Sequence, residues 1–316
     1  MVQDAAKLIG KIKENINIAF AGKESTIDRL ICCLISGGHL LLEDVPGVGK
    51  TTLALSLVNS ISCSFGRVSF SPDTLPSDIT GVTIFNSASK EFEYRPGPVM
   101  NNIFLADEIN RTPPKTQSAL LEAMQEHKVT VDGVTHSIDG LFMVIATQNP
   151  IEFTGTYPLP EAQLDRFMMK ISLGYPDKND ELRLAEMFLN EKKAENLEPV
   201  CSVADITELQ ELAKKVTVKN NVLEYVHTII SATRIEKRFM TGASPRAMLA
   251  LIRAAQANAL MNGRDYVKPD DIKQLYVPVL LHRLPLSIEA RMSHDNPETI
   301  LHSLLANIEV PVDVAQ

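Results

Sequence analysis

Short, almost uninterrupted apolar runs recur through the first half of the chain. Each run has the length and the continuous hydrophobicity of a strand that is buried on both faces, as in a parallel sheet. Segments of helical character separate the runs, and this alternation is typical of a doubly wound α/β domain. The sequence therefore predicts a parallel five-stranded sheet with strands at His39–Leu42, Arg67–Phe70, Ile103–Ala106, Phe142–Ala146 and Met168–Leu173.

Two of the intervening helices have recognisable boundaries. One is expected over Thr51–Ser60, directly after the first strand. The other is expected to begin at Pro113 and Pro114, because proline is favoured in the first turn of a helix, with Thr112 as its N-cap. This helix should continue through Met124.

Two segments interrupt the alternation of strands and helices. Val82–Arg95 has the pattern of two short strands around a polar turn. Lys128–Val131 and Val134–Ile138 flank Asp132-Gly133, which is a strong signal for a two-residue hairpin turn. We expect both segments to be β-hairpin insertions that project from the sheet.

After Tyr175-Pro176-Asp177 the pattern becomes helical, with apolar residues at i, i+3 and i+4 spacing. We therefore expect an α/β domain over residues 1–177 and an all-helical domain over residues 178–316. The helical spacing is clearest at Ile206, Leu209 and Leu212, at Val222, Val226 and Ile229, and at Met248, Leu249 and Ile252.

Composition narrows the class of protein. The net charge is −8, whereas a protein that coats nucleic acid usually carries the opposite sign. No apolar run approaches the roughly 20 residues that span a bilayer, and the N-terminus lacks an apolar signal core, so the cytoplasm is the default expectation. The cysteines and histidines show no metal-ligand spacing: Cys32 and Cys33 are expected to be buried free thiols, and His39, His127 and His136 to lie at turns or on the surface.

The most informative segment is LLLEDVPGVGKTT, which runs from Leu40 to Thr52. An apolar strand leads into a glycine-containing loop, and the loop opens a helix, which is the arrangement of a phosphate-binding P-loop. Glycines allow backbone N–H groups to close around phosphate oxygens, and the helix N-terminus favours negative charge. We predict an ATP site formed by Pro46, Gly47, Val48, Gly49, Lys50, Thr51 and Thr52, in which Lys50 contacts the β- and γ-phosphates and the Thr51 hydroxyl binds Mg²⁺.

Asp44 departs from this pattern, because the usual P-loop has a glycine at that position. A carboxylate beside a phosphate cradle is electrostatically unfavourable. We therefore expect the Asp44 side chain to point away from the phosphates.

Polar groups also end two later strands. Asp107 and Glu108 follow Ile103–Ala106, and the carboxyl end of a parallel strand is where ligands bind in such sheets. Asp107 can hold Mg²⁺ through water, and Glu108 can orient and deprotonate an attacking water. Asn149 ends another strand, where it either hydrogen-bonds the lytic water or γ-phosphate or forms a turn before Pro150.

These residues, in this order, resemble the AAA+ ATPases and more narrowly the MoxR group. The resemblance covers almost the whole chain. It is carried by GGHLLLEDVPGVGKT, SPDTLPSDITG, RPGPVMNNIFLADEINR, ATQNPIEFTGTYPLPEAQLDRF and GASPRA. It implies an AAA+ core with β-hairpin insertions and a C-terminal helical lid. Many sequences of the group share the aspartate at position 44.

The resemblance assigns roles to single residues. Lys50 and Thr51 match Walker A, Asp107 and Glu108 match Walker B, and Asn149 matches sensor 1. Arg246, in GASPRA, matches sensor 2, which is expected to reach the nucleotide of its own subunit. Arg166, in LDRF, matches the arginine finger that acts on the neighbouring subunit. Phe20, Ala21 and Gly22 occupy the usual place of the adenine pocket.

The resemblance also implies partners. It implies a homo-oligomeric ring, commonly a hexamer, and a chaperone-like ATPase that remodels or matures a protein client. Such proteins often work with von Willebrand factor A-type partners and with metal or cofactor insertion. A nucleic-acid motor or loader of the same superfamily is the alternative, but Thr83–Tyr94 contains a single basic residue, Lys90. A non-hydrolysing nucleotide switch is disfavoured because no catalytic residue is missing.

Overall fold

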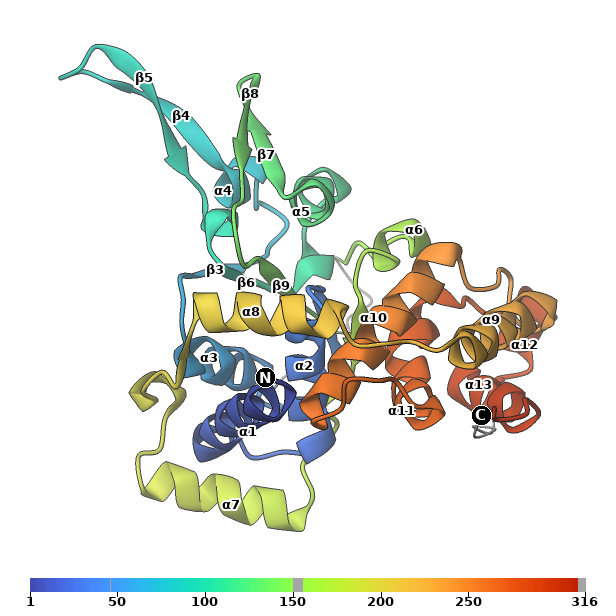
Figure 1. Ribbon diagram of the computed structural model, residues 1–316. Coiled ribbons are helices and arrows are strands. Elements are labelled where there is room, and N and C mark those ends of the chain that lie inside the picture. Colours follow the sequence, from blue (N-terminus) through green and yellow to red (C-terminus); the bar gives the residue numbers. More distant parts are fainter. Residues whose placement is uncertain (46, 150–155, 312–316) are drawn as a thin grey trace.

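The computed structural model describes residues 1–45, 47–149 and 156–311 (Figure 1). At its centre is a parallel sheet in the order β10-β1-β9-β6-β3, which confirms the predicted five-stranded architecture. The observed strand ends differ from the predicted ones by at most two residues. The strands are β1 (Leu40–Glu43), β3 (Phe65–Ser69), β6 (Ile103–Asp107), β9 (Met143–Gln148) and β10 (Met169–Ile171).

Helices cover both faces of the sheet, which explains why its strands are continuously apolar. Leu40 and Leu42 of β1 face the cluster formed with the first group of helices, whereas Leu41 faces the second. The first group is α1 (Val2–Ala19), α2 (Glu24–Ile35), α3 (Lys50–Ser60) and α8 (Val203–Lys214), and the second is α4 (Pro76–Thr80) and α5 (Pro114–Glu126).

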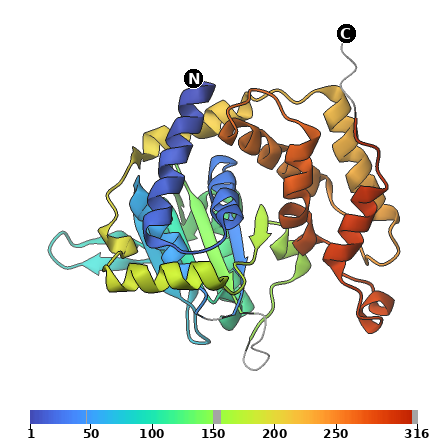
Figure 2. The same cartoon turned by 90° about the horizontal axis from the view of Figure 1, so that it is seen from below.

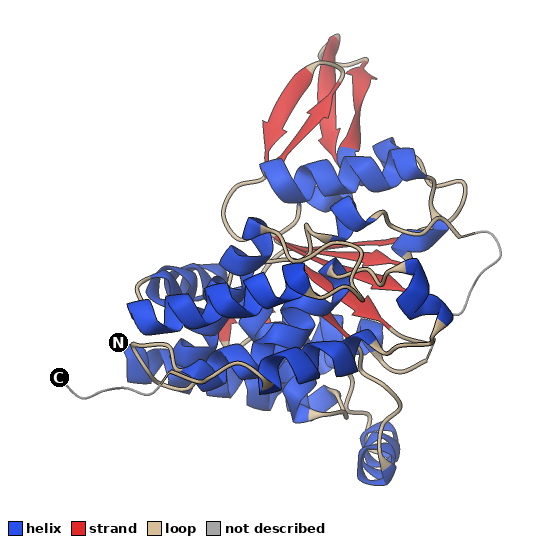
Figure 3. Ribbon diagram, turned by 90° about the vertical axis from the view of Figure 1, so that its right-hand side faces the viewer, coloured by secondary structure: helices blue, strands red, loops and turns tan. Residues whose placement is uncertain are grey.

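Two β-hairpins project from one end of this domain, as predicted (Figures 1 and 3). Each forms its own antiparallel pair outside the central sheet. The ring of Tyr94 stacks on the ring of His136 at a centroid distance of 3.7 Å, so the hairpins contact each other. The strands are β4 (Gly81–Asn86) with β5 (Glu91–Pro96), and β7 (Lys128–Val131) with β8 (Val134–Ser137).

The segment that follows the sheet returns to the α/β domain. In α7 (Lys178–Leu189), Arg183 donates a hydrogen bond to the carbonyl of Asn17 in α1. After the turn η3 (Ala194–Asn196), the short strand β11 (Cys201–Ser202) pairs with β2 (Ile61–Ser62). The division of the chain between residues 177 and 178 stays a prediction.

The C-terminal part of the chain is helical and packs beside the sheet (Figures 1 and 2). Its α10 confirms the helix expected around Leu249. Leu249 itself is 57% exposed, and the buried face consists largely of small residues such as Ala247, Ala250 and Ala254. The elements are α9 (Asn220–Ile235), α10 (Pro245–Met261), α11 (Pro269–Leu280), η4 (Leu281–Arg283), α12 (Ile288–Met292) and α13 (Pro297–Ala306).

Two sequence-based expectations were wrong. Thr112 is not the N-cap of α5, because Pro113 occupies that position, and the Thr112 hydroxyl donates to the carbonyl of Thr74. His39 is buried rather than at the surface: one ring nitrogen bonds the Met124 carbonyl and the other accepts from the Val144 N–H. Cys32 and Cys33 are buried free thiols, as predicted. Within the described residues, no helix is long and apolar enough to cross a membrane.

Candidate nucleotide-binding site

The loop between β1 and α3 has the backbone of a phosphate cradle. Gly47 and Gly49 have φ values of +85° and +93°, a left-handed conformation that favours glycine. Gly49 is the N-cap of α3, so Lys50, Thr51 and Thr52 form the first turn of this helix. The Lys50 ammonium donates to the Asp44 carbonyl at 2.6 Å. The predicted contact of Pro46 lies outside the described residues.

The Asp44 side chain points away from this loop, as expected. One carboxylate oxygen accepts hydrogen bonds from the Ser172 hydroxyl at 2.8 Å, the Leu173 N–H at 2.6 Å and the Gly174 N–H at 2.7 Å. The other oxygen accepts from the Val45 N–H at 3.0 Å. Asp44 therefore ties the start of the loop to the chain that leaves β10.

Asp107 is the last residue of β6, and its two carboxylate oxygens have different partners. One accepts from the Thr147 hydroxyl at 2.7 Å and the other from the Arg67 guanidinium at 2.8 Å. Sequence reasoning missed both partners. Thr147 stands two residues before Asn149, but a threonine within a strand carries no signal of its own.

Glu108 follows with φ of +60°, so the chain turns sharply where β6 ends. Its N–H donates to the Thr147 hydroxyl at 2.8 Å, and its carboxylate accepts from Arg111 at 2.8 Å. Arg111 lies in the short helix η2 (Ile109–Arg111). The single Thr147 hydroxyl thus positions both acidic residues.

Asn149 follows β9 and is only 4% exposed. Its carbonyl accepts from the Asn110 side chain at 3.2 Å. The strands β1, β9 and β6 are adjacent and parallel, so their carboxyl ends share one edge of the sheet. The P-loop, Asp107, Glu108 and Asn149 therefore lie along the same edge.

The oxygen atoms of this site fit a Mg²⁺ ion that is bound together with a nucleotide. The Thr51 hydroxyl and the Asp107 carboxylate supply the hard oxygen ligands that Mg²⁺ prefers, and most of its shell remains for phosphates and water. The described residues contain no group of three or more His, Cys, Asp or Glu side chains that would hold a metal by itself. The arrangement suits a metal that arrives with a triphosphate.

Arg166 and Arg246 lie at the opposite edge of the sheet. Arg166 precedes β10, where the Met168 N–H bonds the His39 carbonyl at the amino end of β1. Arg246, at the start of α10, forms an ion pair of 3.8 Å with Asp165, the neighbour of Arg166. Four residues of β1 span about 13 Å, so this edge is well separated from the P-loop of the same chain.

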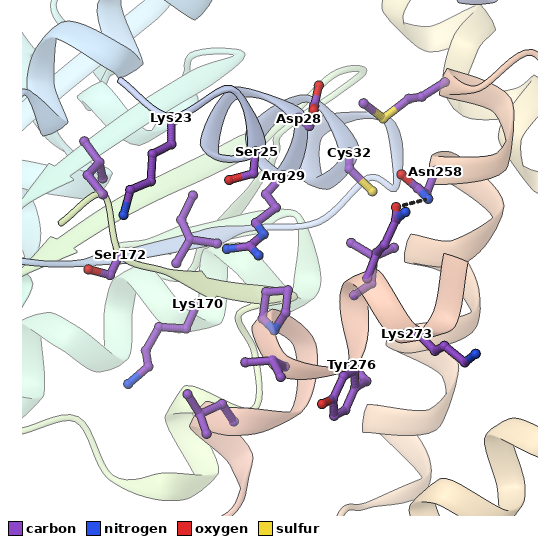
Figure 4. Close-up of a pocket in the computed structure, with 18 of the residues that line it drawn as sticks. Lys23, Ser25, Asp28, Arg29, Cys32, Lys170, Ser172, Asn258, Lys273 and Tyr276 are labelled. Atoms are coloured by element: carbon purple, nitrogen blue, oxygen red, sulfur yellow. Dashed lines mark hydrogen bonds between the residues drawn. The ribbon is translucent and has the colours of Figure 1, made fainter. Parts of the chain in front are cut away.

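A cavity of about 1080 Å³ lies between α2 and β10 on one side and α10 and α11 on the other (Figure 4). Lys23 and Arg29 extend into it, and Asn258 on its far wall hydrogen-bonds Gln274 at 3.2 Å. The lining reaches Gly174 but includes none of residues 47–52. This cavity is therefore a cleft between the sheet side of the molecule and the helices α10 and α11, and not the phosphate-binding loop.

The site combines a phosphate-binding loop between a strand and a helix with two acidic residues at the end of a neighbouring strand. On a sheet of the order β10-β1-β9-β6-β3, these features define an ATP-binding P-loop ATPase. Comparisons with known proteins agree. Residues 39–169 match the family model "ATPase family associated with various cellular activities (AAA)", and residues 231–304 match the "AAA lid domain" model. We use the name lid for residues 231–304.

More specifically, the chain belongs to the MoxR group of AAA ATPases. It is 41% identical to Chaperone MoxR1 of Mycobacterium tuberculosis over 92% of this chain and 79% of that protein. It is 49% identical to the uncharacterized protein YeaC of Bacillus subtilis, covering 98% and 97% of the two chains. A Cytophaga hutchinsonii crystal structure assigned as an ATPase has 39% identity and a TM-score of 0.92, covering 98% and 97%.

Proposed function

We propose that this ATPase is active only in a ring of identical subunits and uses ATP hydrolysis to remodel a protein client. The observation that carries the proposal is the separation of the site's parts. Lys50, Asp107 and Glu108 lie where the parallel strands end, which we call the carboxyl edge of the sheet. Arg166 lies where the strands begin, which we call the amino edge. A head-to-tail contact between two copies would bring the two edges together, and its repetition closes a ring, commonly a hexamer.

In the proposed reaction, the P-loop amides and Lys50 bind the triphosphate. Glu108 accepts the proton of the attacking water, and Asn149 orients that water. Thr51 and Asp107 would hold Mg²⁺, which neutralises phosphate charge when it is bound. Arg166 of the neighbouring subunit stabilises the charge that develops on the γ-phosphate.

The ion pair between Arg246 and Asp165 changes one sequence-based expectation. Arg246 was expected to reach the nucleotide of its own subunit. Because Asp165 adjoins Arg166 at the amino edge, we propose instead that Arg246 acts beside Arg166 on the neighbour's nucleotide. The exposed side chain of Arg246 supports an approach to another subunit.

The client surface is proposed to be the pair of hairpins. Phe85 and Phe92 are 54% and 76% exposed at the β4–β5 hairpin, and their rings contact each other edge-to-face. Glu91 and Glu93 flank Phe92, which favours a protein client over the alternative of a nucleic acid. The similarity to a protein named a chaperone supports this proposal. Three further parts of the proposal rest on the resemblance to the MoxR group alone. They are a von Willebrand factor A-type partner, a role in metal or cofactor insertion, and a location in the cytoplasm.

The Glu108→Gln variant tests the catalytic assignment. It should bind a fluorescent ATP analogue with nearly unchanged affinity and lose about 10²-fold or more of its turnover, because the general base is gone. Glu208→Gln, a matched change on the exposed face of α8, should retain full turnover. Unchanged hydrolysis by Glu108→Gln would remove Glu108 from the mechanism.

Dilution tests the requirement for a ring. If the arginine comes from a neighbour, turnover per subunit should fall as the protein is diluted and should follow the oligomer population measured by sedimentation. A turnover per subunit that stays constant while the oligomer dissociates would contradict a shared site.

A further inference from the structure

Arg283, in η4 of the lid, is a buried charged residue whose side chain is only 4% exposed. A guanidinium removed from water destabilises the fold unless its N–H groups are paired. Arg283 donates to the Asp165 carboxylate at 2.9 Å and to the Phe167 carbonyl at 2.8 Å. Its bonds therefore hold the Asp165 side chain and the Phe167 backbone, which lie on either side of Arg166 in the chain.

Arg166 has the opposite character. Its N–H bonds the Gln163 carbonyl at 3.2 Å, so its backbone is held in place. Arg166 lines a small cavity beside α5, and within the described residues its guanidinium has no hydrogen bond or ion pair. An unpaired cation on a fixed backbone suits a group that acts outside its own subunit.

Asp165 receives a second cation from the same lid. One of its carboxylate oxygens bonds Arg283, and the other lies 3.8 Å from Arg246. Burial lowers the pKa of Arg283, and the Asp165 carboxylate opposes this shift. Because η4 also packs against α6 (Glu161–Leu164) and β10, the lid is attached to the chain around Arg166 on several sides.

We propose that Arg283 is a positioning residue that couples the lid to the arginine finger. Through Asp165 and Phe167 it holds Arg166 at the distance at which it meets the neighbour's nucleotide, and a change in lid angle moves the finger. The proposal rests on the proposed role of Arg166 in trans. An apolar side chain could fill the same space, but the planar guanidinium donates to a carboxylate and a carbonyl from separate N–H groups in a fixed geometry.

The first measurement separates turnover from nucleotide binding. Arg283→Lys keeps the charge but loses the planar fork. It should lower kcat by about 10- to 100-fold, the effect of misplacing a catalytic group by about 1 Å, while ATP affinity at its own P-loop changes little. Arg238→Lys is the matched control, because Arg238 forms a similar two-bond ion pair with Glu236 inside the lid. That control should retain normal turnover.

The second measurement mixes two proteins of low turnover in one ring. Arg283→Lys subunits keep an intact P-loop and Glu108, whereas Glu108→Gln subunits keep an intact finger. Where a Glu108→Gln subunit presents its finger to an Arg283→Lys subunit, one complete site forms, so mixing should restore hydrolysis. Arg166→Ala mixed with Glu108→Gln should recover in the same way, and Lys50→Ala mixed with Glu108→Gln should not.

The outcomes separate the inference from the proposal on which it rests. If the Arg166→Ala mixture recovers but the Arg283→Lys mixture does not, Arg283 acts within its own subunit and the inference is overturned. Normal kcat in Arg283→Lys also overturns it. If the Arg166→Ala mixture fails to recover, the trans role of Arg166 fails first. Should Arg283→Lys not fold, as judged by circular dichroism, Asp165→Asn must show the same loss and the same recovery.

Discussion

Asp44 replaces the glycine that usually begins a P-loop, and the structure predicts that restoring glycine is harmful. The carboxylate accepts four hydrogen bonds, three of them from the segment Ser172–Gly174 that leaves β10. Asp44 is 7% exposed, so water replaces these acceptors poorly. The Asp44→Gly change removes every one of them and adds backbone freedom to the unfolded chain.

The loss of stability follows from the donors that remain. The Leu173 N–H is buried and the Gly174 N–H is partly buried, and a buried donor without an acceptor costs about 1–3 kcal/mol. The Ser172 hydroxyl is exposed and can turn to water. We therefore expect Asp44→Gly to lower the free energy of unfolding by about 3–5 kcal/mol, and Asp44→Asn, which keeps one acceptor oxygen, by roughly half as much.

Circular dichroism at increasing urea concentration is the suitable assay, because the chain has no tryptophan to report unfolding. Asp73→Asn, on an exposed loop, is the matched control and should leave the unfolding midpoint unchanged. If the free energy of unfolding of Asp44→Gly lies within about 1 kcal/mol of that of the parent protein, the carboxylate is not what ties the loop to β10, and this reasoning is refuted.

Three further predictions follow from other contacts. Thr147→Val should lower the kcat of ATP hydrolysis by about 10- to 100-fold, because the Asp107 carboxylate and the Glu108 N–H both lose a hydrogen-bond partner. A normal kcat would contradict this prediction. Burial lowers the pKa of His39 to about 4, below its unfolded value of about 6.5, so its contribution to stability is present above pH 6.5 and is lost as the pH falls toward 4. Between pH 7 and pH 5 this group should lower the free energy of unfolding, measured with urea, by about 2 kcal/mol, and an unchanged free energy would count against it. Replacing both Phe85 and Phe92 with serine in an ATP-bound Glu108→Gln trap should reduce the capture of clients about tenfold. The same two replacements in the protein that keeps Glu108 should leave basal turnover normal. Equal capture would exclude the hairpin as the client surface.

The sequence was sufficient to predict the sheet, the hairpins and the P-loop because these features depend on local patterns. Continuous apolar runs mark strands that are buried on both faces, and Asp132-Gly133 marks a turn. The orientation of Asp44 was also predictable, because a carboxylate is repelled from a phosphate cradle. The buried face of the lid helix α10 was harder to predict, because it consists largely of alanines. Alanines pack closely without the large residues that define a hydrophobic stripe.

The contacts that organise the site are long-range and were not predictable from one sequence. Arg283 meets Asp165 across 118 residues of chain, and Arg67 meets Asp107 across 40. Neither arginine lies in a motif, and most arginines form surface ion pairs. His39 has a polar ring at the start of a strand, and only the folded chain supplies its two buried backbone partners.

The left-handed backbone of Glu108 sets two demands on one residue. A non-glycine side chain at φ of +60° is strained by about 1 kcal/mol, so glycine or asparagine would suit the backbone better. Neither supplies a carboxylate. Selection for thermal robustness and selection for catalysis therefore oppose each other at this position, and a library screened only for heat resistance should enrich replacements of Glu108 that no longer turn over ATP.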